Sequence, residues 1–210
     1  MNDIESITVL QKIFKKTNAI DSQDIEIAST ILNAINTDDR DYYVCQFIEW
    51  LAIYADIKYI DTCLSLVRPS RTSLDKYSAF ISVAIRLIRE KKYDIALGVL
   101  AEIEENATAL EKTAIDNWQV AQAWEELADI YLSLEIVETA KKILLKAASV
   151  AQSGQNNETN LLDVKECSSI LFAITKKMVK YGYYSDANTV AMSIKTDSWR
   201  KVALTELEVK

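Results

Sequence analysis

The groups in this sequence that could do chemistry are carboxylates, lysines and three cysteines, because its 210 residues include no histidine. Without imidazole, a serine or cysteine nucleophile lacks its usual activating base, and zinc lacks one of its commonest ligands. The adjacent carboxylates Glu104-Glu105 and Glu125-Glu126 are the candidates for acid-base catalysis or metal binding. Neighbouring side chains on a helix point about 100° apart, so such pairs rarely converge on one atom. The sequence therefore predicts a protein that is not an enzyme and has no cofactor or metal; a carboxylate enzyme or ligand sensor is the alternative.

Phosphate-binding motifs are missing as well. The chain has 3 glycines, all far apart, whereas nucleotide-binding loops need clustered glycines where the backbone approaches phosphate. Cys45, Cys63 and Cys167 are an odd number without the CxxC spacing of a thiolate metal site. That pattern is typical of buried, reduced thiols in a cytosolic protein.

The charge of the chain argues against nucleic acid or a membrane surface as a partner. The chain has 24 basic and 31 acidic residues, a net charge of −7, which repels phosphate-rich surfaces. Residues 94–138 are strongly acidic and residues 165–201 are basic. We interpret this asymmetry as solvated helix faces, or as two surfaces that face different partners or each other in a homo-oligomer. Nucleic-acid binding would depend on one basic set: Lys176, Lys177, Lys180, Lys195, Arg200 and Lys201.

The elements that must position these groups are helices. Turn residues are scarce, with 3 Gly and 1 Pro in the whole chain, and apolar residues recur at helical spacing almost throughout. We expect an all-α fold of about ten helices, with 153–160 as the clearest loop. The N-terminus lacks the order of a signal peptide, and no apolar run approaches the roughly 18 residues of a membrane span. A soluble, cytoplasmic protein is the expectation.

A motif of large and small residues recurs along the chain. In its best copy Trp124 is followed by Leu127, Ala128 and Tyr131, and a small residue, Ala140, begins the packing stripe of the next helix. Similar series start at Phe47, Phe80 and Leu171, with a half-series at Trp199. The intervals from Phe80 to Trp124 and on to Leu171 are 44 and 47 residues. The motif resembles the tetratricopeptide repeat, whose usual period is about 34 residues.

The resemblance implies an antiparallel helix-pair solenoid in which small residues let paired helices approach closely. It implies one α-solenoid domain over 1–210, with two N-terminal helices in 1–36 packing on its end. Residues 41–207 would form about four helix pairs and a terminal capping helix. The long intervals and the missing glycines and proline of the family leave an irregular helical array, such as a HEAT-like one, as the alternative.

In such an array the first helix of each pair lines a concave wall, and the register of the motif predicts which residues face it. The helix over 77–88 is apolar almost all round, so it is either ordinary core or an open apolar groove. We expect a non-catalytic interaction module or adaptor that binds a protein or peptide segment, without nucleic acid or membrane as partner; the alternative is a structural homo-oligomer joined through apolar helical surfaces. The predicted groove residues are Ile81, Ile85, Ile88, Arg89, Glu125, Asp129, Phe172, Lys176, Val179 and Lys180.

Overall fold

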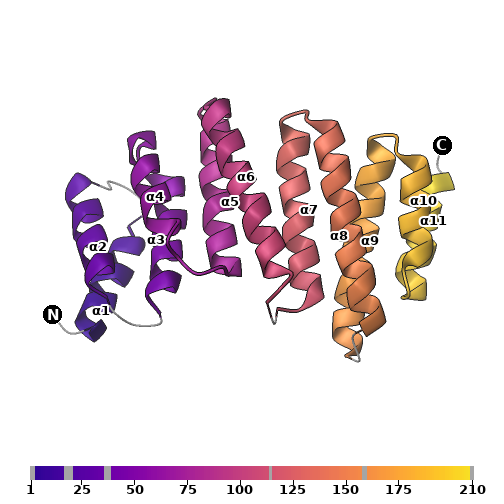
Figure 1. Cartoon of the computed structure of the whole chain (residues 1–210), viewed down its shortest axis with the longest axis horizontal. Helices are drawn as coiled ribbons and strands as arrows, with labels where there is room; N and C mark the ends of the chain where they lie inside the picture. Colours follow the sequence, from indigo (N-terminus) through magenta and orange to yellow (C-terminus); the bar gives the residue numbers. More distant parts are fainter. Residues whose placement is uncertain (1–2, 17–20, 36–38, 114, 158–159, 209–210) are drawn as a thin grey trace. The chain divides into compact units, whose positions relative to one another are not determined.

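A computed structural model describes residues 3–16, 21–35, 39–113, 115–157 and 160–208 (Figure 1). These residues form α-helices and one 3-10 turn and contain no strand, so the all-α prediction is confirmed for the described part of the chain. The elements are α1 (Asp3–Phe14), α2 (Ser22–Ala34), α3 (Arg40–Tyr54), η1 (Ile57–Tyr59), α4 (Ile60–Val67), α5 (Leu74–Arg89), α6 (Tyr93–Leu110), α7 (Asn117–Ser133), α8 (Val137–Asn157), α9 (Leu161–Lys180), α10 (Tyr184–Ser193) and α11 (Asp197–Glu208).

The chain divides into two compact units, unit 1 (Met1–Asn106) and unit 2 (Ala107–Lys210), with the boundary inside α6. Side chains cap the starts of several helices in both units. The carboxylate of Asp21 accepts from the amide of Asp24 at α2, and the hydroxyl of Ser73 accepts from the amide of Lys76 at α5. Such caps satisfy amides that have no partner within the helix.

Unit 1 is built around α3, which packs against α2, α4 and α5. An aromatic cluster joins α1 to this helix, because Phe14 lies within 6.0 Å of both Phe47 and Trp50, measured between ring centroids. The indole nitrogen of Trp50 donates a hydrogen bond of 2.9 Å to the carbonyl of Lys16. With neighbours on several sides, α3 is buried almost all round, including Ile48.

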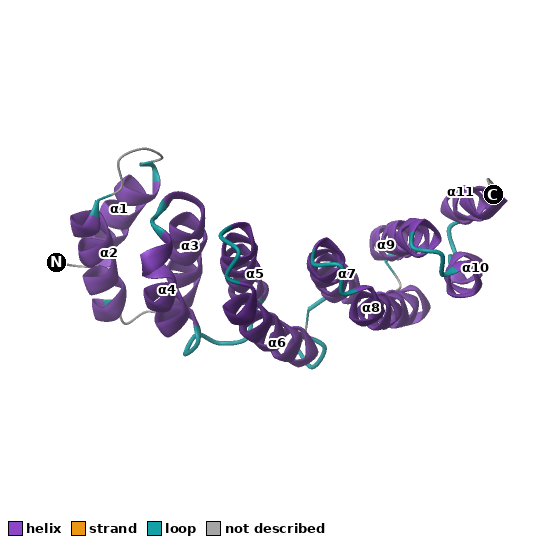
Figure 2. Cartoon of the chain, turned by 90° about the horizontal axis from the view of Figure 1, so that it is seen from above, coloured by secondary structure: helices purple, strands orange, loops and turns teal. Residues whose placement is uncertain are grey.

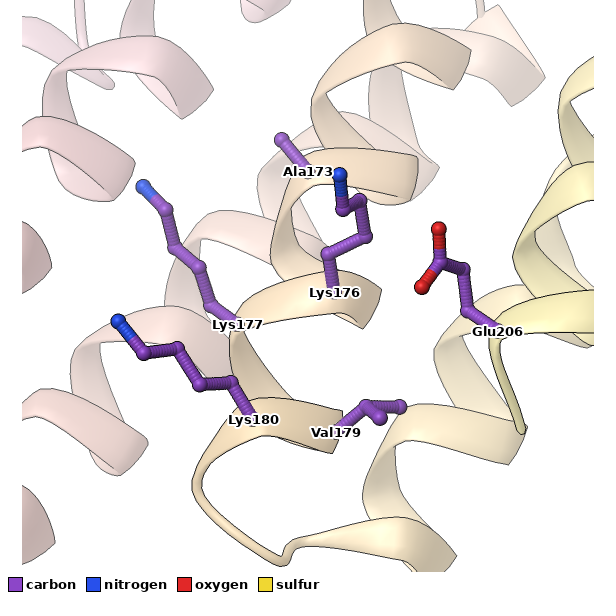
Figure 3. A pocket seen from close by; sticks show the side chains of 6 residues that line it. All are labelled: Ala173, Lys176, Lys177, Val179, Lys180 and Glu206. Atoms are coloured by element: carbon purple, nitrogen blue, oxygen red, sulfur yellow. The ribbon is translucent and has the colours of Figure 1, made fainter. Parts of the chain in front are cut away.

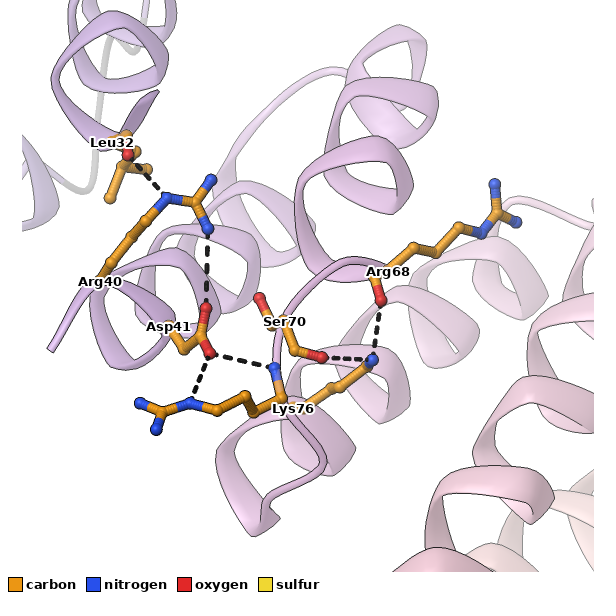
Figure 4. Close-up of polar contacts among 7 residues, drawn as sticks. Leu32, Arg40, Asp41, Arg68, Ser70 and Lys76 are labelled. Carbon is orange, nitrogen blue, oxygen red and sulfur yellow. Dashed lines mark hydrogen bonds and ion pairs between the residues drawn. The ribbon is translucent and has the colours of Figure 1, made fainter. Parts of the chain in front are cut away.

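A polar cluster fixes the start of α3 to the segment before α5 (Figure 4). One carboxylate oxygen of Asp41 accepts from the backbone amide of Arg71 at 3.0 Å, and the other pairs with Arg40 at 3.6 Å. Lys76 donates to the carbonyls of Arg68 and Ser70 at 2.8 and 2.7 Å. Burial acts to raise the pKa of Asp41, but the hydrogen bonds from Arg71 and Ser70 and the positive charge of Arg71 together outweigh it and lower that pKa. The charged groups of this cluster therefore stabilise the contact between the start of α3 and the segment before α5.

Unit 2 contains two layers of helices (Figure 2). In one layer α7 packs against α9 and α9 against α11; the other layer holds α8 and α10, and α8 packs on α7 and α9, and α10 on α9 and α11. The small residues Ala140 and Ala187 are fully buried. Ala96, the corresponding residue of α6 in unit 1, is also fully buried. The prediction that Ala140 begins the packing side of its helix is confirmed, and Ala96 and Ala187 lie at the equivalent positions of the motif.

Three helix pairs are joined by the same turn. After α5, α7 and α9 a residue in the left-handed region ends the helix: Lys91 (φ 60°), Glu135 (φ 61°) and Gly182 (φ 83°). In each turn the following amide donates to a carbonyl five residues back, as in Lys92 to Leu87 at 2.8 Å. This is the hydrogen-bond pattern of a Schellman helix end. The turn residues are 44 and 47 positions apart, the same intervals as in the sequence motif.

The prediction of a loop at 153–160 is wrong for its first part, because α8 continues to Asn157; residues 158 and 159 lie outside the described residues. Long-range contacts hold this end of the helix. A side chain at Gly154 would stand 2.7 Å from the sulfur of Cys167, so only glycine permits this close approach. The buried side-chain oxygen of Gln155 accepts from the hydroxyl of Ser168 at 2.9 Å and the amide of Lys195 at 2.8 Å.

The three cysteines are free and buried, as predicted. Burial raises the pKa of the Cys45 and Cys63 thiols to about 12. Both remain protonated near neutral pH and are therefore poor nucleophiles. Within the described ranges, every helix is too short or too polar to cross a bilayer.

Candidate functional site

The predicted groove residues lie on three helices. Ile81, Ile85, Ile88 and Arg89 are on α5 of unit 1, whereas the other six are on α7 and α9 of unit 2. The first group belongs to unit 1 and the second to unit 2, so they form two separate candidate sites. The unit 2 group comprises Glu125 and Asp129 on α7 and Phe172, Lys176, Val179 and Lys180 on α9.

The unit 1 group is an apolar edge of α5. Ile81 and Ile88 are half-buried, Ile85 is 43% exposed and Arg89 is exposed. The opposite side of the helix is core, because it packs on α3 and α4. Arg86 extends to α3, where its guanidinium lies 3.4 Å from the carbonyl of Ala52. This edge of α5 is therefore only partly covered, with Ile85 and Arg89 exposed, and it offers little free polar chemistry.

An ionic cluster joins α7 to α9 in unit 2. The ammonium of Lys177 contacts the carboxylate of Glu125 and lies 2.6 Å from that of Asp129. The side chains of Lys177 and Glu125 are 21% and 15% exposed, so this pair is partly shielded from water. The predicted groove does not include Lys177. Its partners are 48 and 52 residues away, and the only sequence signal is the reversal from an acidic to a basic segment.

Glu126 lies beside this cluster and has an altered acidity. Burial raises its pKa, and the neighbouring charges of Glu125 and Asp129 add to the effect. Two contacts act in the other direction: a hydrogen bond of 2.9 Å from the side-chain amide of Gln122, and the positive charge of Lys177. Three carboxylates and one ammonium therefore share this edge of α7.

An open groove with a volume of about 490 Å³ lies between α9 and α11 (Figure 3). Lys177 and Lys180 extend in the same direction from α9, and Glu206 extends from α11 toward α9. Two apolar residues, three lysines and one glutamate line the groove, and the ammonium of Lys177 lies on the α7 side. The lining residues are Ala173, Lys176, Lys177, Val179, Lys180 and Glu206.

An aromatic pair lies one turn further along the same helices. The rings of Phe172 on α9 and Trp199 on α11 are 5.0 Å apart between centroids. The ammonium of Lys176 is 5.6 Å from the centre of the Phe172 ring, within the range of a cation-π contact. Both aromatic residues are half-buried. Phe172 and Lys176 are thus in contact, as expected for two residues on one face of α9. Trp199 of α11 packs against Phe172.

Two lysines of the groove are free to bind a ligand. Lys176 and Lys180 are exposed. Each contacts an aromatic ring, Phe172 or Tyr181, and neither forms an ion pair with another described residue. Lys177 differs because its ammonium forms ion pairs with the carboxylates of Glu125 and Asp129. The lining thus includes two lysines, one helical turn apart on α9, that form no ion pair with another described residue.

A second open groove, also of about 490 Å³, lies between α1 and α2 of unit 1. Apolar and uncharged polar side chains line it, with Glu26 as its one ionisable lining residue. Among the side chains that the structure describes, no group of three or more cysteines, aspartates or glutamates is arranged so that it could hold a metal ion. Of these two grooves, the α9–α11 groove therefore has the more highly charged lining.

Comparisons with known proteins give no independent guide to this groove. No protein-family model matches the chain, and neither a curated protein nor a solved structure is found to match it.

Proposed function

We propose that this chain is a non-catalytic protein-binding module of the tetratricopeptide-like kind, and that unit 2 binds a polypeptide segment along α7, α9 and α11. The observation that carries the proposal is the open α9–α11 groove, whose lysines Lys176 and Lys180 have no ionic partner in the described fold. A groove with apolar walls and a few charged groups has the general features of a binding site.

The repeated turns support the helix-pair part of the proposal. Three successive pairs end their first helix with the same hydrogen-bond pattern, at the intervals of the sequence motif. The first helices α7, α9 and α11 pack side by side, and α8 and α10 cover them from one side. Helix-pair arrays use the surface of their first helices to bind other chains.

The chemistry of the site supports a binding role over catalysis. The partly shielded lysine, Lys177, is held by Glu125 and Asp129, and the thiols are buried. The groove offers charge and apolar surface but no activated nucleophile, because neither Lys176 nor Lys180 is desolvated.

A selection from a random displayed-peptide library tests the proposal while the identity of the partner is still open. The full chain is immobilised, and enriched peptides are synthesised and titrated while backbone amide exchange is measured. We expect saturable binding and slower amide exchange in α9 and α11. The proposal fails if no peptide is enriched above a blank surface, or if the protected amides lie outside α7, α9 and α11.

A structural homo-oligomer is the second candidate, favoured by one observation. Leu161 and Leu162 at the start of α9 are 77% and 61% exposed, and Met192 on α10 is 59% exposed. Exposed apolar side chains of this size often cover one another in an assembly. Sedimentation velocity over a wide concentration range separates the candidates, because an oligomer becomes larger with concentration and Leu161→Ser with Leu162→Ser would abolish that change.

A further inference from the structure

The α9–α11 groove has a directional charge pattern. Lys176 and Lys180 lie on the α9 side and Glu206 on the α11 side. An anionic group in the groove is therefore attracted toward α9 and repelled from α11. Because Lys177 is already paired with Glu125 and Asp129, only two of the three lysines can attract a ligand at full strength.

The spacing of the two free lysines suggests the shape of the ligand. Residues four apart on a helix are separated by about 6 Å along its axis. In an extended polypeptide, side chains on the same face are two residues apart and separated by about 6.6 Å. Acidic residues at alternate positions of an extended segment that runs along α9 thus match the axial spacing of Lys176 and Lys180; the Lys180 side chain extends from α9 away from α11, beside Lys177 (Figure 3).

Apolar contacts complete the groove. Ala173 and the largely buried Val179 lie beside the lysines, and the Phe172–Trp199 ring pair borders the groove one turn away. These surfaces favour an apolar side chain two residues from an acidic one, on the same face of the extended segment. A purely ionic ligand, such as free phosphate, would leave this part of the groove unused.

We infer that the α9–α11 groove binds an extended acidic polypeptide segment, with acidic residues at alternate positions against Lys176 and Lys180 and an apolar residue on Ala173 and Val179. The inference rests on the proposed function and specifies its partner by chemistry. Attraction at an open site depends on salt, so the complex weakens as ionic strength rises.

The probe is a fluorescein-labelled nonapeptide with Asp at two alternate positions, Leu two residues beyond the second Asp so that all three share a face of the extended chain, and Ser elsewhere. Its binding to the full chain is measured by fluorescence anisotropy at about 0.05 M and about 0.5 M salt. We expect saturable binding at low salt. In the double variant Lys176→Glu with Lys180→Glu, the Kd rises about tenfold or more, because two attractive contacts become repulsive.

The matched control is Lys142→Glu, which makes the same kind of charge change at an exposed lysine on α8, in the other layer of unit 2. We expect it to change the Kd less than about twofold, since a distant charge is screened by salt. Circular dichroism checks that each variant folds. Lys177 is left intact because it joins α9 to α7.

Each of these results with the peptides overturns the inference: no binding of the Asp peptide, equal binding of a peptide with Lys in place of Asp, no loss in the double variant, or a loss of equal size in Lys142→Glu. Tighter binding of a single-stranded oligothymidylate than of the Asp peptide also overturns it, in favour of nucleic acid. The displayed-peptide selection distinguishes a failure of this inference from a failure of the proposed peptide-binding function. Enriched peptides that lack acidic residues, or that still bind the double variant, refute this inference and leave a peptide-binding function in place.

Discussion

Helices α5 and α9 contain the same sequence motif and end in the same turn but differ in the surface that they expose. Each is the first helix of a pair and ends in the same turn, and Leu87 and Met178 supply the carbonyls that close those turns. Their outward residues differ in chemistry. Where α5 has the isoleucines Ile81 and Ile85, α9 has Phe172 and Lys176.

The comparison distinguishes two sides of each helix. One side packs in the core and stabilises the fold, and the other side can vary in chemistry and bind a partner. The side of each helix that contains Leu87 or Met178 is buried in its own unit. The exposure of the outward side depends only on the elements that lie next to it. On α5 those neighbours leave a half-buried apolar edge, whereas on α9 they leave a charged, open groove. Equivalent backbone positions therefore do not imply equivalent binding surfaces.

The largest expected effects come from removing the shared core. Leu87→Ala and Met178→Ala each lower the free energy of unfolding by about 2–5 kcal/mol, because each deletes a buried side chain and leaves a cavity. The two side chains are 1% and 0% exposed. Urea unfolding followed by circular dichroism measures both changes.

Ile85→Ala is the matched test of the outward side. Ile85 is 43% exposed, so we expect a loss below about 1 kcal/mol. A loss as large as that of Leu87→Ala would mean that another surface covers Ile85, and the contrast between the inward and outward sides of α5 would disappear.

Local patterns in the sequence predict the helices and the buried alanines, but not the contacts between distant segments. The burial of Ala140 and Ala187 is predictable because helical spacing fixes which side of a helix they share. The polar run from residue 153 is typical of a loop, yet Gly154 lies against Cys167, and Gln155 bonds Ser168 and the backbone of Lys195. Those partners make the run helical, and none is local in sequence.

The same limit applies to the site. The repeat register groups Glu125 and Asp129 with Lys176, because all three fall at outward positions. It does not identify Lys177 as the partner of the two carboxylates, because a rotation of one residue along a helix turns a side chain by about 100°. Lys177 and Glu125 meet only because α7 and α9 pack side by side.

The two turns provide the next largest effect. Gly182 follows α9 in the left-handed region, and Lys91 adopts the same conformation after α5. Gly182→Ala should lower the free energy of unfolding by about 1–2 kcal/mol, because a Cβ atom disfavours that conformation. No atom lies within 4 Å of the added Cβ, so the cost is in the backbone. Lys91→Gly should raise the free energy of unfolding by about 0.5–1 kcal/mol.

Urea unfolding measures both turn variants, and Glu135→Gly after α7 is a third case with the same expected sign. If Lys91→Gly destabilises the protein, the side chain of Lys91 contributes more than the backbone conformation costs. The three turns would then not be equivalent despite their common hydrogen bonds.

The smallest expected effect is a difference in acidity between two half-buried carboxyl groups. Burial raises the pKa of Glu49 on α3, and Asp75 on α5 adds to the rise. Burial also raises the pKa of Glu126 on α7, with Glu125 and Asp129 acting in the same direction, but Lys177 of α9 opposes them. A raised pKa means that the folded state holds the proton more tightly than the unfolded state. Each group therefore costs stability as the pH rises through and above its ordinary value of 4.5.

Replacing either carboxyl by an amide removes that cost. Glu49→Gln and Glu126→Gln should each raise the Tm at pH 7 and have little effect below about pH 4, where glutamate is protonated in both states. Lys177→Gln separates the two sites, because it removes the cation that lowers the pKa of Glu126 and leaves Glu49 in its original surroundings. NMR titration of the side-chain carboxyl carbons should show a further rise for Glu126 and none for Glu49. An unchanged Glu126 would mean that Lys177 does not act on the acidic edge of α7, and that the contact between α7 and α9 leaves the charge of that edge uncompensated.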